Sequence, residues 1–218
     1  MSAPTVWIAS GNAKKRVELE RLFAGHLPYP VRSLGEAPTP IDWDEDAPDF
    51  AGNAAIKAST VARAVGSYAL ADDSGLVVDA LGGAPGVHSA RYAGPDATDA
   101  DRIVKLLAEL ADAPAPRTAR FVCHVCLAAP DGTILARFEE TCEGSILTAR
   151  RGDGGFGYDP VFVPDATRDQ EPAPTFAELD PATKDAISHR GKALRRLLAW
   201  LSENPLLPGP VCPTDPTP

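Results

Sequence analysis

The sequence predicts an α/β fold in which helices flank a central mixed β-sheet, and two observations support this. In the first part of the chain, short apolar runs typical of buried strands alternate with stretches of helical spacing. Later, two strand-like segments, residues 118–128 and 134–147, are separated by the turn sequence Pro130-Asp131-Gly132-Thr133 and predict a long antiparallel hairpin. Parallel and antiparallel pairings in one sheet make that sheet mixed.

The first half of the chain supplies a strand, a helix and a second helix. Residues 5–9, TVWIA, are an apolar run that ends at a polar turn and predict a buried strand. The next stretch places Leu19, Leu22 and Phe23 at helical spacing, with Gly25 as the expected stop. Residues 49–65 are rich in alanine and predict the second helix, with one apolar stripe.

The second half adds two more helices and a tail. A helix is expected after Thr98, whose spacing to Asp101 resembles a capping box, and a last helix begins near Ser188. Residues 164–175 are rich in Pro, Asp and Thr and predict a loop. We expect one domain over residues 1–203 and a Pro-rich, disordered tail over residues 204–218.

Composition narrows the class of protein. The chain has 218 residues, 44% hydrophobic and 23% charged, which is typical of a folded globular protein. Its formal net charge of −9 argues against nucleic acid or an anionic membrane as the main partner, because both are bound through basic surface. The chain shows no signal-peptide pattern and no apolar run near the ~18 residues of a membrane span, so we expect a cytoplasmic protein.

The pair Cys123 and Cys126 has the spacing of a zinc or redox motif. The surrounding sequence FVCHVCL reads as a strand, however, on which residues three apart point to opposite faces. No second such pair completes a zinc site, so we interpret both cysteines as apolar strand residues.

Two adjacent carboxylates, Asp72 and Asp73, follow the apolar run of residues 68–71, where we expect a buried strand to end. Like charges repel, and removing them from water is costly without compensation. The pair is therefore either a solvated turn or the site of a cation, and carboxylates with this placement suit Mg²⁺.

Two other polar stretches have both a structural and a functional interpretation. Residues 10–15, SGNAKK, come between the first strand and the first helix, where free N–H groups can seat a phosphate, but an ordinary polar turn has the same pattern. The acidic run Asp44-Glu45-Asp46 precedes the second helix, on which Asn53 and Lys57 share a face. Acidic residues before a helix often only complement its dipole.

The last two stretches are candidates for binding a base or an anion. Residues 152–159, GDGGFGYD, combine closely spaced glycines with Phe156 and Tyr158, which offer flat faces for a base; a flexible loop with two buried aromatics is the alternative. Residues 184–192 concentrate Lys, His, Arg and Lys in a chain of negative net charge.

Taken together, these stretches resemble the inosine/xanthosine triphosphate pyrophosphatase family, the Ham1-like non-canonical purine nucleotide diphosphatases. The resemblance runs in order over residues 5–201. It rests on SGNAKK, FAGNAAIKA, ADDSGL, GGAPGVHSARYAG, GGFGYDPVF and ISHRGKAL. It implies a strongly twisted sheet and two lobes with a nucleotide cleft between them. It also implies Mg²⁺-dependent hydrolysis of ITP, dITP and XTP to the monophosphate and pyrophosphate, commonly by a homodimer.

The resemblance also assigns roles to residues. Asp73 would hold Mg²⁺ and accept the proton of the attacking water, with support from Asp72, and Glu45 or its neighbour Asp44 would be the second metal ligand. Lys15 and Lys57 would supply positive charge, and Ser74 would contact substrate. The triphosphate would bind Ser10, Gly11, Asn12, Ala13, Lys14 and Lys15; the base pocket would comprise Phe156, Gly157, Tyr158 and Asp159, with recognition completed by Lys184, His189 and Arg190.

One departure from the family pattern is important. The glutamate of the family's F-x-E-N-A motif is Gly52 here, which puts the arrangement around the metal in doubt and leaves the neighbouring acidic residues to compensate. Two alternatives to this enzyme stay open. The missing carboxylate suggests a non-catalytic nucleotide-binding protein on the same fold. The other alternative is a pyrophosphatase for canonical or modified pyrimidine nucleotides on a related fold.

Overall fold

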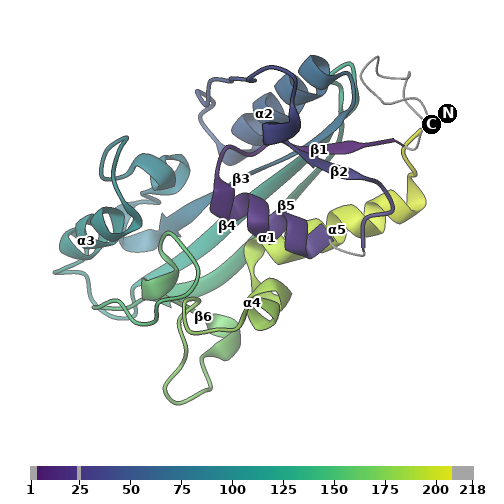
Figure 1. Cartoon of the computed structure of the whole chain (residues 1–218). Helices are drawn as coiled ribbons and strands as arrows, with labels where there is room; N and C mark the ends of the chain where they lie inside the picture. The colour runs from purple at the N-terminus through teal and green to yellow at the C-terminus, as the bar shows by residue number, and fades with distance from the viewer. Residues whose placement is uncertain (1–3, 24–25, 208–218) are drawn as a thin grey trace. The chain divides into compact units, whose positions relative to one another are not determined.

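The computed structural model describes residues 4–23 and 26–207 and contains one six-stranded sheet with the strand order β2-β1-β3-β4-β5-β6 (Figure 1). Strand β1 pairs in parallel with β2 and β3, whereas β5 and β6 are antiparallel, so the predicted mixed sheet is confirmed. The strands are β1 (Val6–Ile8), β2 (Val31–Ser33), β3 (Tyr68–Val78), β4 (Thr118–Ala128), β5 (Ile134–Ile146) and β6 (Phe162–Pro164). The helices are α1 (Ala13–Phe23), α2 (Phe50–Val65), α3 (Asp99–Glu109), α4 (Pro181–Ile187) and α5 (His189–Glu203).

The chain forms two compact units. Unit 1 comprises Met1–Asp73, His124–Glu139 and Ala193–Pro218, and unit 2 comprises Ser74–Cys123 and Glu140–Lys192. The boundary crosses β3 between Asp73 and Ser74, in the middle of the ADDSGL motif. The single domain expected over residues 1–203 stays a prediction.

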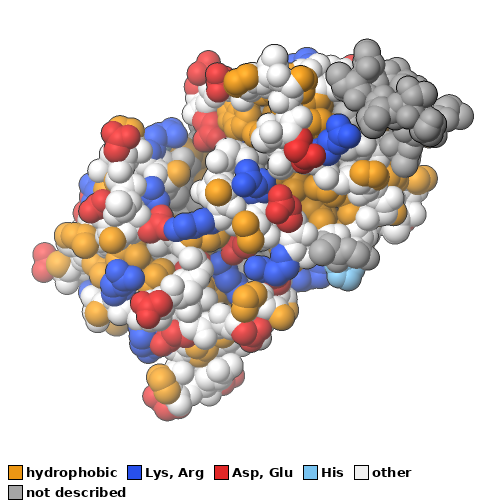
Figure 2. Space-filling view, viewed as in Figure 1, with side chains coloured by type: hydrophobic (Ala, Val, Ile, Leu, Met, Phe, Trp, Pro, Cys, Tyr) orange, Lys and Arg blue, Asp and Glu red, His pale blue; other side chains and the backbone are white. Residues whose placement is uncertain are grey.

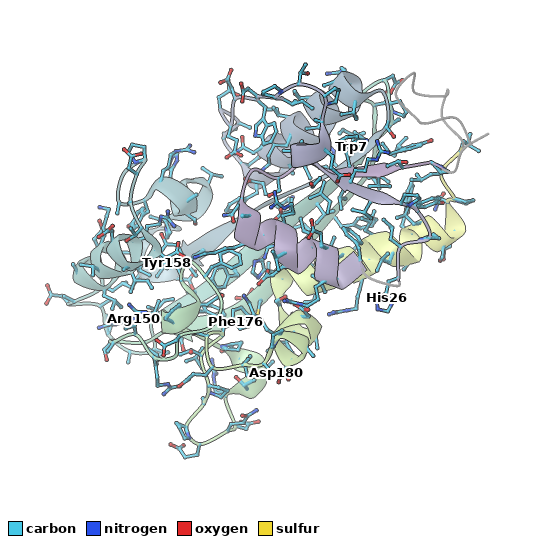
Figure 3. All side chains as sticks on the ribbon, in the orientation of Figure 1. Trp7, His26, Arg150, Tyr158, Phe176 and Asp180 are labelled. Atoms are coloured by element: carbon cyan, nitrogen blue, oxygen red, sulfur yellow. The ribbon has the colours of Figure 1, made fainter. Side chains whose placement is uncertain are left out.

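One core cluster of unit 1, beneath α2, is built mainly from small side chains. Trp7 of β1 lies under this helix (Figure 3), together with alanines of β1 and β3 and with the fully buried Ala54 and Ala58 of α2. Alanine favours helix formation, and its small side chain lets the helix approach the sheet closely. The helix begins where expected, because the Asp49 side chain accepts a hydrogen bond from Gly52 N at 2.7 Å.

The core of unit 2 is aromatic. The ring centroid of Phe121 lies 4.7 Å from that of Phe162 and 5.8 Å from that of Phe176, and the centroids of Phe162 and Phe176 are 5.1 Å apart. Leucine and isoleucine residues of α3 complete this core, and Thr98 and Asp101 form the predicted capping box at the start of that helix. Phe176 and Tyr158, both labelled in Figure 3, belong to the same cluster.

Several sequence-based expectations need correction or extension. The strand that begins at Tyr68 does not end at the aspartate pair but continues to Val78. The short strands β2 and β6 and helix α4 were not predicted. Helix α1 ends at Phe23, and the expected stop at Gly25 lies outside the described residues.

The start of the predicted tail is held on unit 1. Leu206 N donates a hydrogen bond to the Tyr29 hydroxyl at 2.7 Å, and the Tyr68 hydroxyl donates to Leu207 O at 3.1 Å. Residues 208–218 lie outside the described part of the chain, so the disorder expected there stays a prediction.

The remaining expectations concern cysteines, membranes and nucleic acid. Cys123 and Cys126 are buried on β4 and form no disulfide, and burial raises the pKa of Cys126 to about 11, as expected for an apolar strand residue. Among the described residues, no helix is long and apolar enough to cross a membrane. On the face shown in Figure 2, acidic side chains are interspersed with basic ones. The expectation that nucleic acid is not the partner stays a prediction.

Candidate active site

The turn between β1 and α1 carries the residues predicted to bind the triphosphate. Asn12 Oδ1 accepts hydrogen bonds from the backbone N–H groups of Lys14 at 2.9 Å and Lys15 at 3.1 Å, so Asn12 caps the helix. Gly11 and Asn12 are exposed, whereas Ser10 is buried. An anion at this turn would therefore meet the Asn12 side-chain amide and the Lys15 ammonium rather than those two N–H groups.

The aspartate pair lies within β3, and this position resolves the question of like charges. Successive residues of a strand point to opposite faces, so the two carboxylates diverge. Each then meets an ammonium group from a different helix: Lys15 Nζ of α1 lies 3.5 Å from Asp72 Oδ2, and Lys57 Nζ of α2 lies 2.7 Å from Asp73 Oδ1. The pair is thus neither a strand end nor a solvated turn, and both carboxylates are buried.

Lys57 joins Asp73 to the acidic loop. Its ammonium also lies 3.3 Å from Glu45 Oε1, which accepts a hydrogen bond from the indole N–H of Trp43 at 3.3 Å. Glu45 is therefore the residue of the Asp44-Glu45-Asp46 run whose carboxylate reaches the buried lysine. The lysine itself is only 4% exposed, and this enclosure strengthens its attraction to both carboxylates.

The charges of this cluster perturb one another. Burial raises the pKa of Asp73 above its ordinary value, and Lys57 and Lys15 offset this only in part. Burial opposes the charged form of Lys57, but Asp73 and Asp72 outweigh it, so the pKa of Lys57 is raised. Burial also acts to raise the pKa of Glu45, but attraction to Lys57 and the Trp43 hydrogen bond lower it overall. The pKa of Asp73 is thus raised, whereas that of Glu45 is lowered.

In unit 2 the glycine-rich segment is folded around a buried ion pair. Asp159 Oδ2 lies 2.7 Å from Lys184 Nζ and accepts a hydrogen bond from Phe156 N at 2.8 Å. Gly155, with φ of +68°, lies so close to Asp159 that a Cβ there would collide with its carboxylate. The glycine spacing therefore serves this turn, which presents the half-buried Phe156 ring.

Two cations flank the Phe156 ring. Lys184 Nζ lies 5.1 Å and Arg190 Cζ 5.8 Å from the ring centroid. Arg190 also donates a hydrogen bond to Ser74 Oγ at 2.8 Å. The neighbouring His189 is 5% exposed and stacks on Phe121 with 4.8 Å between ring centroids and 8° between planes. The predicted recognition residues of unit 2 are thus brought together.

Tyr158 does not offer a flat face to a ligand. Its ring is 3% exposed, and its hydroxyl donates a hydrogen bond to Ser89 O at 3.0 Å (Figure 3). Burial raises its pKa, as expected for a phenol in an apolar core. Ser89 in turn accepts a hydrogen bond from Leu76 N at 2.9 Å and donates to Gly86 O at 2.6 Å. Tyr158 therefore ties the glycine-rich turn to the segment around Ser89, and Phe156 is the aromatic face that stays accessible.

Comparison with known proteins identifies the family. The sequence model of the Ham1 family matches residues 6–200, which is nearly all of the described chain. The chain belongs to the Ham1 family.

Curated relatives of this Ham1-family chain share about half of its residues. A dITP/XTP pyrophosphatase of Thermosynechococcus vestitus is 51% identical over 191 residues, which cover 87% of this chain and 91% of that protein. A dITP/XTP pyrophosphatase of Geobacillus kaustophilus is 51% identical over 192 residues, 87% of this chain and 90% of the relative. The high coverage on both sides means that the match involves whole proteins.

Solved structures agree with the sequence match. A HAM1 protein from Coxiella burnetii aligns with a TM-score of 0.81 at 41% identity and covers 92% of this chain and 99% of its own. The Ham1 protein of Staphylococcus aureus aligns with a TM-score of 0.79 at 36% identity, with 92% and 99% coverage. The six-stranded fold of this chain is therefore the fold of the Ham1 family.

The donor set around Asp73 fits a hard cation that keeps water ligands. Glu45 and Asp73 supply carboxylate oxygens that face one ammonium, and no cluster of three or more His, Cys, Asp or Glu side chains suited to a metal occurs in residues 4–23 and 26–207. One or two carboxylates completed by water and phosphate is the arrangement that Mg²⁺ prefers. The carboxylates of Glu45 and Asp73 also share the single ammonium group of Lys57, so a cation between them would balance the second negative charge.

Three residues that support the site were given no role from the sequence of this Ham1-family chain. Trp43 holds Glu45, Asn53 contacts Asp73, and Ser89 anchors Tyr158. The helical spacing of Asn53 to Lys57 was noted from the sequence, but its contact with Asp73 was not predicted. Trp43 stands beside the acidic run, and this neighbouring aromatic was the available signal.

Proposed function

We propose that this chain hydrolyses the non-canonical purine nucleotides dITP, ITP and XTP to the monophosphate and pyrophosphate with Mg²⁺, and so cleanses the nucleotide pool. The observation that carries the proposal is the Glu45–Lys57–Asp73 cluster in a chain of the Ham1 family. The two curated relatives described above are dITP/XTP pyrophosphatases, which supports the choice of dITP and XTP.

In this proposal unit 1 provides the reaction chemistry. Glu45 and Asp73 would hold Mg²⁺, which when bound would neutralise phosphate charge. Lys15 and the turn from Ser10 to Lys14 would bind the triphosphate and orient it, since phosphoryl transfer depends more on positioning and charge than on a covalent nucleophile. Asp73 would accept the proton of the attacking water.

Unit 2 provides the recognition of the base. Phe156 would stack on the purine, and Arg190, held by Ser74, would donate toward O6 of hypoxanthine or xanthine. Adenine carries an amino donor at that position, and a buried donor that faces another donor is a strong means of rejection. Asp159 and Lys184 would act chiefly by fixing the turn that carries Phe156, while Gly157, Tyr158 and His189 would shape the pocket around it.

The assembly and location of the protein are also proposals. We propose a homodimer, as the family resemblance implies, and a cytoplasmic location. Sedimentation of the purified chain would test the dimer: a mass near twice the 22.9 kDa of one chain is expected, and a mass of one chain would refute it.

The deciding experiment measures pyrophosphate release from dITP, ITP, XTP, dATP, dGTP and a panel of pyrimidine triphosphates, with Mg²⁺ and after chelation. Release from the first three alone, lost on chelation, is expected. Release from pyrimidine nucleotides instead would indicate a pyrophosphatase for pyrimidine nucleotides, the second alternative left open by the sequence. Saturable ITP binding without release from any nucleotide would point to a non-catalytic binding protein.

A further inference from the structure

The close contact between the acidic loop, residues 42–49, and the first turn of α2 depends on Gly52. A Cβ built on Gly52 would lie 2.5 Å from the Cβ of Ala47 and 3.2 Å from Asp49 Oδ1. Carbon atoms that are not bonded pack at about 3.5–4.0 Å, so any side chain at position 52 would push the loop away. The space that a family glutamate would occupy is here taken by Ala47.

Asn53 connects this loop to the proposed catalytic carboxylate. Its Oδ1 accepts a hydrogen bond from Ala47 N at 3.0 Å, and its Nδ2 donates to Asp73 Oδ2 at 3.5 Å. The side chain is 1% exposed, so both groups would be costly to leave unpaired. A single buried amide thus spans from the loop backbone to β3.

The position of Glu45 follows from these two contacts. Glu45 precedes Ala47 by two residues, and its carboxylate lies 3.3 Å from the Lys57 ammonium that also binds Asp73. Trp43, on the other side of Glu45, packs against the core beneath α2. The loop is therefore fixed on both sides of Glu45, and a shift at Ala47 would move the Glu45 carboxylate.

We propose that Gly52 and Asn53 are positioning residues, which dock the acidic loop on α2 so that Glu45 and Asp73 face one cation. The inference rests on the proposed function only in naming that cation as Mg²⁺. In this arrangement Gly52 does not mark a lost carboxylate; it permits the close approach that brings Glu45 to the site.

The first test is Gly52→Ala in the full chain, with two readouts that do not need turnover. Hydrogen exchange of the metal-free protein reports loop docking, because the Ala47 N–H is bonded to Asn53. We expect faster exchange over residues 42–49 and about 10-fold weaker Mg²⁺ binding by calorimetry, the size typical for partners of metal ligands.

The matched rescue variant is Ala47→Gly combined with Gly52→Ala, which removes the Cβ that the new alanine would meet. We expect the exchange rates of the loop and the Mg²⁺ affinity to return toward those of the parent. The effect of the single Ala47→Gly variant is measured separately and subtracted. Gly35→Ala is the control, because a Cβ there has Ser33 Oγ at 3.8 Å as its nearest neighbour and φ is not positive.

Asn53→Ala tests the second positioning residue. Faster exchange of the loop and a raised Mg²⁺ requirement are expected, with kcat largely recovered at saturating Mg²⁺. The inference would be overturned if Gly52→Ala kept the Mg²⁺ affinity and the loop exchange rates of the parent. It would also be overturned if the Ala47→Gly, Gly52→Ala double variant recovered neither property. If the parent chain binds Mg²⁺ and shows these effects but hydrolyses none of the nucleotides, the proposed function fails and the positioning role stands.

Discussion

The ion pair between Lys184 and Asp159 gives a quantitative test of how unit 2 holds the Phe156 turn. Both side chains are nearly buried, with 7% and 5% exposure, and their charged atoms lie 2.7 Å apart. Lys184→Met keeps an unbranched apolar side chain, one heavy atom shorter, and removes the charge. The Asp159 carboxylate would then lose its nearest cation while it stays in a site of low polarity.

The expected loss follows from these contacts. Removing one partner of a buried ion pair typically costs about 3–5 kcal/mol, because the other charge stays buried. Asp159 keeps the hydrogen bond from Phe156 N, so we expect the lower end, about 3 kcal/mol. For a chain of this size that corresponds to a fall in Tm of roughly 6–12 °C, measurable by calorimetry or circular dichroism.

The double variant Lys184→Met with Asp159→Asn is the control. A neutral amide at position 159 still accepts from Phe156 N, so we expect the double variant to be more stable than Lys184→Met alone. A fall in Tm of less than about 2 °C for Lys184→Met would show that the ion pair does not hold the turn. The same conclusion follows if the Tm loss of the double variant equals the sum of the losses of the two single variants.

Three further predictions concern the proposed chemistry. Asp73→Asn should lower kcat for dITP by about 10²–10⁴-fold, because the proposed proton acceptor is lost, and should also weaken Mg²⁺ binding, because a proposed metal ligand loses its charge. Since burial raises the pKa of Asp73 and the ionised carboxylate is the reactive form, kcat/KM should fall as pH drops through that raised pKa. Higher Mg²⁺ should move this acidic limb to lower pH, because a cation favours the ionised form. Asn12→Ala should cost about 1 kcal/mol of stability and raise the KM for dITP, because Asn12 caps α1 beside the triphosphate turn.

Each of these predictions has an outcome that contradicts it. Turnover by Asp73→Asn close to that of the parent would assign the proton acceptor elsewhere. An acidic limb that does not move with Mg²⁺ would separate the titrating group from the metal. A stable Asn12→Ala variant with unchanged KM would show that the turn neither needs its cap nor contacts the substrate through Asn12.

Much of the fold could be predicted because local signals were strong. The capping box of Thr98 and Asp101, the alanine-rich stretch of α2 and the turn between β4 and β5 each act over a few residues, and all three are found in the structure. The short strands β2 and β6 were missed because three residues carry too little periodicity to stand out.

The end of β3 was misplaced for a different reason. Two charged residues in an apolar run normally mark a turn, and only ammonium groups from distant parts of the chain let the strand continue through them. The separation between Lys15 and Asp72, or between Lys57 and Asp73, cannot be read from local spacing.

The sequence by itself determined the family, the mixed α/β architecture and the set of residues proposed for the site. The family was recognisable because its motifs keep their order along nearly the whole chain. Only the tertiary structure decided that the two aspartates diverge to opposite faces and that Glu45 rather than Asp44 reaches Lys57. It also decided that Tyr158 is buried and that Gly52 admits the acidic loop. These features depend on which side chains from remote segments meet, and such contacts arise only when the strands and helices pack.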